Sequence, residues 1–404
     1  DVTIIGGGAS GMAAAVFAAE AGLKVRLFEK NEKLGKKLYI TGKGRCNFTS
    51  ACNPEEFLEN VVSNRKFLYS AIYGFNSFDT IDFFERLGLR TKVERGRRAF
   101  PASDHSSDVI KALRKRIEEL GVEVNLNTEV KELPVPDEEH AVIAATGGLS
   151  YPSTGSTGDG YAFAEKTGHR ITETRPALVP FETKEDFIKE LQGLSLRNVS
   201  FTLKNGRKTV YEGFGELVFT HFGISGPLVI SASSYAAALL KDTALSAHID
   251  LKPALTYEQL DDRILREFES GKNKCFRNIL SGLLPSKMIP VMIEMTGIPS
   301  DRSVNSLTKE DRKRLAESLK DFSFTVTGTR DYNEAVITQG GISVKDIDPK
   351  TMESRLVKNL YFIGEVIDVD ALTGGYNLQI AWSTAYAAVR SIAEKAWSAD
   401  SQGS

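Results

Sequence analysis

The chain opens with DVTIIGGGASGMAAAVFAAEAGLKVRLFEK, residues 1–30, and this stretch decides the fold. An apolar segment, Val2 to Ile5, runs directly into the glycine motif Gly6-x-Gly8-x-x-Gly11. A run of small residues then predicts a helix, and a second apolar segment, Lys24 to Phe28, ends at an acid. Strand, glycine turn, helix and strand in this order predict a Rossmann unit that binds a dinucleotide.

Each part of the motif has a physical role in holding a nucleotide. The first glycine permits the tight turn, the second lets a pyrophosphate approach the backbone, and the third lets the helix pack closely on the sheet. The N-terminus of the helix favours an anion, because its N–H groups are unpaired and its dipole end is positive. An acid about 20 residues further on accepts hydrogen bonds from ribose hydroxyls. The expected contacts are Gly6, Gly8, Ala9, Ser10, Gly11 and Glu29.

Composition limits the class of protein. A chain of 404 residues with 41% hydrophobic and 26% charged residues is long enough for two or three domains. The formal net charge of −2 predicts no general attraction to membranes and makes a nucleic-acid partner an unfavoured expectation. The longest apolar run, Pro227 to Leu240, is too short to span a bilayer, and no signal peptide is expected. Three scattered cysteines and five histidines form no disulfide or metal pattern, so a cytoplasmic protein without a metal is expected.

Later segments predict more of the same sheet and an insertion. Strands are expected at 122–126 and 140–145. A β-rich region begins near residue 178, with a hairpin at Asn205-Gly206, and residues 256–320 have helical patterns. A strand pair, 322–327 with 334–338, a last strand at 360–363 and a helix at 376–396 follow. The predicted domains are a nucleotide-binding domain (1–178 and 340–404), an inserted β-rich domain (179–255 and 322–339) and a helical subdomain (256–321).

Three distant segments resemble the glutathione-reductase-like FAD fold. They are the glycine motif at 6–11, the strand end ATGG at 145–148, and LYFIGE at 360–365. The resemblance implies an α/β protein with a Rossmann FAD-binding domain and non-covalent FAD rather than NAD. In that fold the third motif usually ends in an aspartate that holds the ribityl chain. Glu365 takes that place here and Asp368 lies close by, so either acid is a candidate.

A narrower resemblance covers nearly the whole chain. GKKLYITGKGRCNFTS, GRRAFPASDHSSDVI, ATGGLSYPSTGSTGDGYAFAEKTGH, FTHFGISGP, ITQGGI and GEVIDVDALTGGYNLQIAWSTAYAA are similar to segments of the bacterial flavoprotein family of aminoacetone oxidase and the BaiN-type proteins. This resemblance implies a Rossmann FAD domain with an inserted β-barrel-like domain and a helical subdomain. It also implies an FAD-dependent oxidoreductase.

Two glycine loops are expected at the flavin ring. The resemblance places TGKGRCN, residues 41–47, against the isoalloxazine, where alternating glycines let backbone pack flat. GGYNLQ, residues 374–379, precedes a helix whose N–H groups can stabilise negative charge on reduced flavin. Plain surface charges and an ordinary helix start are the competing interpretations. The residues expected at the ring are Thr41, Gly42, Arg45, Cys46, Asn47, Gly375, Asn377, Leu378 and Gln379.

The remaining cofactor candidates are basic or small. Lys30 and Lys37 are expected to neutralise the pyrophosphate, although solvated charges are an equal alternative. Cys46 and Cys52 have five residues between them, unlike the spacing of redox pairs on this fold, so Cys46 is expected to be a small residue packed beside the flavin. Further expected contacts are Val130, Thr146, Gly147 and Gly148.

Two residues are candidates for catalysis. His221 is the candidate acid or base on the substrate side, because an imidazole titrates near neutral pH. A hydrogen-bonded histidine at a domain junction is the competing interpretation. Arg45 is the candidate that favours the anionic reduced flavin. No second strand-framed glycine motif exists, so NAD(P)H is expected only as a transient donor at the flavin face.

Three functions remain open at this point. The first is an amine oxidase for an aminoacetone-like compound, in which oxygen takes the electrons and forms peroxide. The second is an NAD(P)H-driven reductase of an enone or steroid-like substrate. Both transfer a hydride between a small organic substrate and flavin N5. The third is a non-catalytic or RNA-associated flavoprotein, against which the balanced charge weighs.

Overall fold

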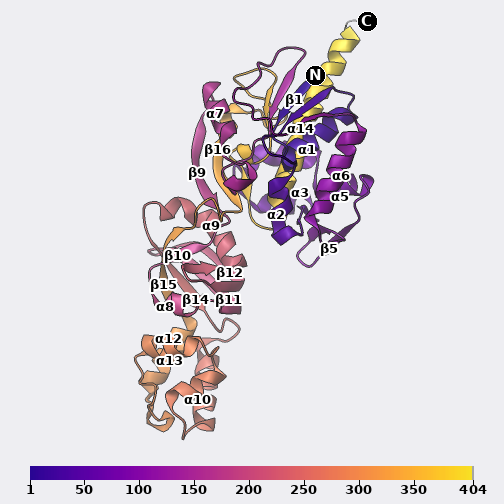
Figure 1. Ribbon diagram of the computed structural model, residues 1–404. Coiled ribbons are helices and arrows are strands. Elements are labelled where there is room, and N and C mark those ends of the chain that lie inside the picture. The colour runs from indigo at the N-terminus through magenta and orange to yellow at the C-terminus, as the bar shows by residue number, and fades with distance from the viewer. Residues whose placement is uncertain (403–404) are drawn as a thin grey trace. The chain divides into compact units, whose positions relative to one another are not determined.

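The computed structural model describes residues 1–402 and divides the chain into two compact units. The first unit contains Asp1–Ala177 together with the chain from Asp331 onward, and the second is Leu178–Arg330. Each unit has its own hydrophobic core. Figure 1 shows that both ends of the chain belong to the first unit and that the middle of the chain forms the second.

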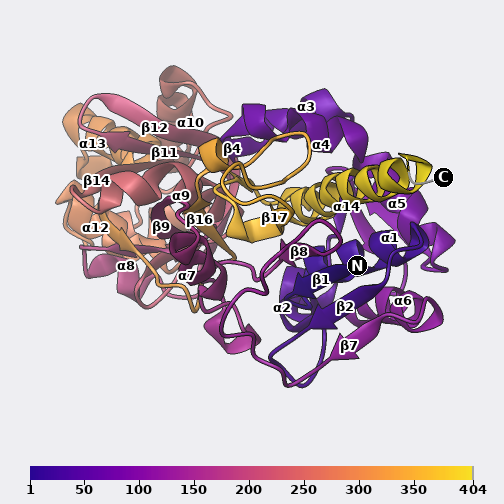
Figure 2. The same cartoon turned by 90° about the horizontal axis from the view of Figure 1, so that it is seen from above.

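The first unit is built on a parallel sheet in the order β17-β8-β1-β2-β7. Every residue of β1 is buried, as expected for a strand covered on both faces. Helix α1 lies against α14 and α6 (Figure 2). The bounds are β1 Val2–Ile5, β2 Val25–Phe28, β7 Glu123–Asn125, β8 Ala141–Ala144, β17 Leu360–Phe362, α1 Ala9–Glu20, α6 Ser106–Glu119 and α14 Tyr376–Gln402.

Glycine allows α1 to approach the sheet closely. A Cβ added to Gly11 would lie 1.8 Å from the carbonyl oxygen of Gly6, so no larger residue fits there. Ala13, Ala14 and Ala18 on the same helix are fully buried. The close packing predicted from the small residues of this segment is therefore present.

Shorter elements complete the first unit. They form a three-stranded sheet β3-β6-β5 and the pairs β4–β18 and β9–β16. Their bounds are β3 Thr49–Ser50, β4 Val61–Ser63, β5 Thr91–Glu94, β6 Arg98–Pro101, β9 Ile171–Ala177, β16 Ile337–Ile342, β18 Asp370–Ala371, α2 Lys36–Ile40, α3 Pro54–Glu59, α4 Tyr69–Gly74, α5 Ser77–Arg86 and α7 Asp159–Lys166.

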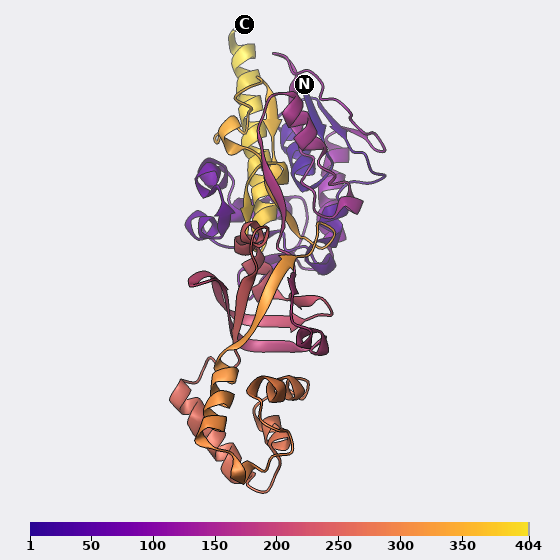
Figure 3. The same ribbon diagram turned by 90° about the vertical axis from the view of Figure 1, so that its left-hand side faces the viewer.

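The second unit is a closed barrel with an insertion of helices. The barrel order is β10-β13-β12-β11-β14-β15, and β14 alternates buried and half-buried residues as a barrel strand must. Helices α10 to α13 connect β14 to β15 and gather beyond the barrel (Figure 3). The bounds are β10 Phe181–Thr183, β11 Ser195–Asn205, β12 Lys208–Phe219, β13 Gly223–Ser225, β14 Leu245–Asp250, β15 Phe322–Thr329, α8 Phe187–Glu190, α9 Pro227–Leu240, α10 Tyr257–Ser270, α11 Phe276–Ile279, α12 Met288–Thr296 and α13 Lys309–Lys320.

Two of the inserted helices, α10 and α13, start at threonine caps. Thr256 and Thr308 each accept a backbone hydrogen bond in a capping box, with Gln259 and Asp311 as the reciprocal partners.

Among the residues that the structure describes, no helix is long and apolar enough to cross a membrane. The predicted fold class, a Rossmann domain with an inserted barrel and helices, is confirmed.

Two predictions about strands were wrong. The segments 322–329 and 337–342 do not pair with each other, because β15 joins the barrel beside β10 and β14 while β16 pairs with β9. Residues 331–339 consequently belong to the first unit. The hairpin turn is also shifted by one residue, since Asn205 pairs with Lys208 and Gly206 takes the positive φ of 58° at the first turn position.

Candidate functional site

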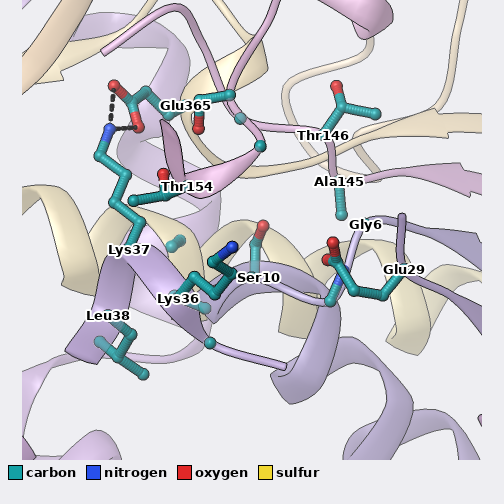
Figure 4. Close-up of a pocket in the computed structure, with 18 of the residues that line it drawn as sticks. Gly6, Ser10, Glu29, Lys36, Lys37, Leu38, Ala145, Thr146, Thr154 and Glu365 are labelled. Atoms are coloured by element: carbon teal, nitrogen blue, oxygen red, sulfur yellow. Dashed lines mark hydrogen bonds and ion pairs between the residues drawn. The ribbon is translucent and has the colours of Figure 1, made fainter. Parts of the chain in front are cut away.

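The main cavity of the first unit opens at the carboxyl ends of its parallel strands. Ile5, Phe28 and Ala145, at or just beyond the ends of β1, β2 and β8, line it, and it contains about 1330 Å³ of empty space including its open mouth. Ligands of open α/β sheets bind at this edge because strands, turns and helix N-termini meet there. Figure 4 shows residues that line the cavity.

The glycine motif forms one wall of the cavity. Gly8 is the N-cap of α1, no side chain caps that helix, and its first turn carries no acid. A Cβ added to Gly8 would meet no atom within 4 Å, so this glycine faces open space. Gly6 has a φ of 106°, and a Cβ there would lie 2.4 Å from the Ala145 carbonyl oxygen. The wall therefore presents free N–H groups to an anion.

Glu29 fixes the next part of the wall. Its buried carboxylate accepts hydrogen bonds from the backbone N–H groups of Gly7 and Asn31, both at 2.8 Å. The Asn31 side-chain amide donates to it at 2.6 Å. The carboxylate is thus held at the end of β2 beside the first helix turn, and it stands on the cavity wall.

Two lysines on the wall already have carboxylate partners. Lys37 Nζ lies 3.0 and 2.7 Å from the two carboxylate oxygens of Glu365, as the dashed lines in Figure 4 mark. Glu365 Oε1 also accepts the backbone N–H of Thr338 at 2.8 Å. Lys30 Nζ lies 2.6 Å from Asp159 Oδ2. A phosphate that binds either ammonium must share it with these acids.

The loop 41–47 has an unusual backbone. Gly42, Lys43, Gly44 and Cys46 all have positive φ values, between 57° and 84°. Thr41 lines the cavity, whereas the rest of the loop does not. A run of left-handed residues that includes two non-glycines is strained, and such strain is concentrated at functional sites.

Arg45 is held by acids on neighbouring segments. Its guanidinium donates to Asp104 and Glu94 at 2.5 Å each, and it lies 4.2 Å above the Phe100 ring centroid. The hydrogen bonds that Arg45 donates to Glu94 and, next in effect, to Asp104 raise the pKa of Arg45. Lys92 joins both acids, so the four side chains form a neutral cluster. Burial raises the pKa of the Cys46 thiol far above its usual range, so this thiol stays protonated.

The segment before α14 is fixed by Asn377. Its side chain accepts the N–H of Ala371 at 2.9 Å and donates to the Ala371 carbonyl at 2.7 Å. Gly375 has a φ of 94°, and a Cβ there would clash with the backbone of Thr49 at 2.5 Å. Gln379 is fully buried and accepts from the Thr49 hydroxyl. The loop and the helix start are therefore a single packed structure.

The structure brings many of the sequence-predicted residues to one cavity. Those that line it are Gly6, Gly8, Ala9, Ser10, Glu29, Lys30, Lys37, Thr41, Val130, Thr146, Gly147, Glu365, Asn377 and Leu378. Those that do not line it are Gly11, Gly42, Arg45, Cys46, Asn47, Gly148, Asp368, Gly375 and Gln379.

Sequence reasoning missed several wall residues. Asn31 and Lys36 stood beside predicted contacts, and Thr338 stood in the ITQGGI segment, so a signal existed for these three. Thr154 and Asp159 reach the cavity only through tertiary structure. Both lie within the family-like segment 145–169, but that resemblance did not single them out as contacts.

His221 belongs to the second unit. It is exposed in the turn between β12 and β13, and its ring lies edge-on to Phe222 with 5.0 Å between the ring centroids. Arg330 lies 4.6 Å above the Phe222 ring. A hydroxyl on the cavity wall, Thr146 Oγ1, is buried without a hydrogen-bond partner among the described residues.

The chemistry of the wall fits FAD. An uncapped helix N-terminus suits a pyrophosphate, and a fixed carboxylate suits ribose hydroxyls. The fold and this cavity define an FAD-binding Rossmann protein of the flavin-dependent oxidoreductase class. The chain belongs to the HI0933-like family, whose model, HI0933-like protein Rossmann domain, matches residues 1–391. The predicted membership of a BaiN-type flavoprotein family is thereby confirmed.

Curated relatives match over nearly the full chain. The ribosomal RNA dihydrouridine synthase of Haemophilus influenzae is 34% identical and covers 97% of this chain and 98% of its own. The 3-dehydro-bile acid delta(4,6)-reductase of Clostridium scindens is 31% identical and covers 98% and 99%. Among solved structures, a 3-ketosteroid-delta4-(5alpha)-dehydrogenase from Rhodococcus jostii RHA1 matches with a TM-score of 0.50 at 13% identity, covering 96% of each chain. This last likeness supports the fold alone.

Proposed function

We propose that this chain is an FAD-dependent reductase that saturates a carbon–carbon double bond conjugated to a carbonyl, and that its substrate is uridine in ribosomal RNA. The observation that carries the proposal is the full-length similarity to the Haemophilus influenzae enzyme. A second ribosomal RNA dihydrouridine synthase, from Escherichia coli, is 33% identical over 97% of this chain. The cytoplasm, where such RNA resides, agrees with three free cysteines.

The relatives' names share one kind of chemistry. Dihydrouridine is uridine with its C5–C6 double bond saturated, and that bond is conjugated to the C4 carbonyl. The Clostridium scindens enzyme is named as a reductase of delta(4,6) bonds in a 3-dehydro bile acid. In both cases a hydride adds to the carbon distant from the carbonyl and a proton adds to the carbon beside it. This common step supports a reductase more strongly than an oxidase.

The residues of the cavity have defined tasks in this proposal. The first turn of α1 and Gly8 hold the pyrophosphate, Glu29 holds the ribose, and Glu365 with Lys37 holds the ribityl side. Bound FAD would supply the hydride from N5 of its reduced ring. Thr41, Asn377 and Leu378, the residues of segments 41–47 and 374–379 that line the cavity, would fix the position of the ring. NAD(P)H supplies the two electrons for each turnover, and solvent supplies the proton.

An anaerobic titration of the FAD-loaded protein tests the proposal. We expect NADH or NADPH alone to bleach the flavin, and unmodified ribosomal RNA transcripts to restore its colour as dihydrouridine forms. Nucleoside mass spectrometry of the digested RNA detects the product. Bleached flavin that no RNA reoxidises would refute the RNA substrate.

The same titration separates the alternatives. Reoxidation by a 3-keto steroid with conjugated double bonds, but not by RNA, would favour the second candidate, which rests on the Clostridium scindens relative. Bleaching by an aminoacetone-like amine alone, followed by peroxide formation in air, would favour the amine oxidase, which stays a prediction. A matched variant, Glu29→Gln, should lose FAD in all assays alike.

A further inference from the structure

Several cations of the helical insertion have acidic partners. Arg312 pairs with Asp261 at 2.6 Å, Arg314 with Asp311 at 2.5 Å, and Lys320 with Asp250 at 2.5 Å. Residues 270–293, here named the basic segment, differ because they contain no aspartate or glutamate. The exposed cations of the basic segment are Lys272, Lys274, Arg277 and Lys287, and none has an ion-pair partner among the described residues.

The basic segment is held firmly by the core beneath it. Phe276 and Leu280 are fully buried, and Met288 is buried in the same cluster. The N–H of Phe276 donates to the Arg302 carbonyl at 2.9 Å, and the N–H of Arg277 donates to the Ser300 carbonyl at 3.0 Å. Its cations therefore project from an ordered backbone, which lowers the entropy cost of binding a ligand.

Two acids lie next to the basic segment. Glu267 packs against Gly282. Asp301 lies between Ser300 and Arg302, whose carbonyls accept backbone hydrogen bonds from the basic segment. Neither forms an ion pair with the four cations among the residues described. Lys287 Nζ donates to the Gln192 carbonyl at 2.6 Å, which orients the ammonium without cancelling its charge.

We propose that the basic segment binds the phosphate backbone of the RNA substrate; this inference rests on the proposed function. A protein with a net charge of −2 must concentrate positive charge locally to bind a polyanion. The exposed neighbours Asn273, Asn278 and Ser281 can donate further hydrogen bonds to phosphate. The large apolar side chains of α11 point into the core rather than outward, which favours RNA over a membrane surface.

The test compares two triple variants of the full-length, FAD-loaded protein. The first is Lys272→Gln, Lys274→Gln, Arg277→Gln. The control removes the same charge from α6 in the first unit, Lys111→Gln, Arg114→Gln, Lys115→Gln, where each cation is exposed and has an acid partner. The probe is an unmodified ribosomal RNA transcript, and the measurement is its dissociation constant across a salt series. FAD content and bleaching by NAD(P)H report folding of both variants.

We expect the first variant to bind RNA at least about tenfold more weakly. The slope of the logarithm of the binding constant against the logarithm of the salt concentration should become less steep by about 2 to 3, because up to three phosphate contacts are lost. The control should bind as the wild type does. A conservative triple, Lys272→Arg, Lys274→Arg, Arg277→Lys, should retain binding. Equal binding by the first variant and the wild type, or equal loss in the first variant and the control, would overturn the inference.

Two further outcomes separate this inference from the proposed function. Wild-type protein that reduces a steroid enone but binds no ribosomal RNA at low salt would refute the RNA substrate and with it the inference. RNA turnover by the first variant that matches the wild type at every salt concentration would refute the segment alone. Loss of binding to phosphatidylglycerol vesicles with unchanged RNA binding would assign the segment to a membrane and also overturn the inference.

Discussion

Lys37 and Glu365 are 328 residues apart in the sequence, and their side chains form an ion pair on the wall of the cavity, with Nζ 2.7 Å from Oε2. Lys37 comes from the short helix after the second strand, and Glu365 follows the last strand of the sheet. Both side chains are about three-quarters shielded from solvent. The pair therefore joins the two ends of the chain at the cofactor cavity.

Breaking this pair should destabilise the first unit. Lys37→Met removes the cation and leaves the carboxylate with the Thr338 N–H, which should cost about 1–2 kcal/mol of unfolding free energy. Glu365→Gln should cost less, because an amide oxygen still accepts that N–H. Urea unfolding of the FAD-free protein measures both. The double variant should have an unfolding free energy close to that of Lys37→Met alone. Strictly additive losses of unfolding free energy would contradict a direct interaction between the two side chains. Lys33→Met, at an exposed lysine, is the control.

Glycine substitutions should separate folding from cofactor binding. Gly8→Ala places a methyl group in open space at a φ of −79°, so the protein should fold normally yet lose FAD affinity at least about tenfold as the methyl blocks the pyrophosphate. Gly11→Ala forces a Cβ to within 1.8 Å of the Gly6 carbonyl oxygen, so the unit should lose roughly 3 kcal/mol or more of stability. Thermal unfolding and FAD titration distinguish the two, and equal effects would be inconsistent with this geometry.

Glu29→Gln should weaken FAD binding by roughly 10–100-fold, because one amide oxygen cannot replace a carboxylate that anchors two backbone N–H groups and that we propose holds the ribose. Quenching of flavin fluorescence on binding measures the dissociation constant. Glu32→Gln changes a largely exposed acid three residues away and should leave affinity unchanged. Wild-type affinity in Glu29→Gln would remove Glu29 from the nucleotide site.

Asp370 should make stability depend on pH. Burial, and to a smaller extent the charge of Asp368, raises its pKa to about 6 from 3.8, against hydrogen bonds from Ser63 and Gln339 that lower it. The folded state therefore holds the proton more tightly than the unfolded chain, so this group's contribution to stability falls as pH rises from about 4 to about 6, by about 3 kcal/mol in total.

Asp370→Asn should remove that loss. The variant should be more stable than the wild type above about pH 6, and the difference should shrink as the pH approaches 4. Urea unfolding across this range measures it. Asp82→Asn, on an exposed side chain of α5, should follow the wild-type profile. A constant difference between Asp370→Asn and the wild type at every pH would contradict the assignment.

Local signals account for what could be predicted from the sequence. Val2 to Ile5, the glycine motif and Glu29 are close in sequence, and their geometry follows from strand, turn and helix preferences that short segments carry. The inserted helices were predicted from the helical patterns of residues 256–320, and the structure adds the capping boxes of Thr256 and Thr308. These parts need no information from the rest of the chain.

The missed features depend on distant partners. Thr338 reaches the cavity because its strand, β16, pairs with β9, whose residue Ala177 lies 160 residues before its partner Ile337. The sequence around Thr338 does not specify which strand β16 pairs with. Asp159 becomes a wall residue through its bond to Lys30. The overall charge likewise could not reveal which cations are neutralised, since that depends on pairs such as Arg312 with Asp261.

The barrel and its helices leave and re-enter the first unit through two adjacent strands, because Ala177 at the end of β9 pairs with Ile337 at the start of β16. An insertion whose ends are neighbours places little constraint on what lies between them. The nucleotide-binding unit therefore constrains the inserted unit, Leu178–Arg330, mainly where the chain enters and leaves it. Relatives of almost equal length carry names for substrates as different as ribosomal RNA and a bile acid.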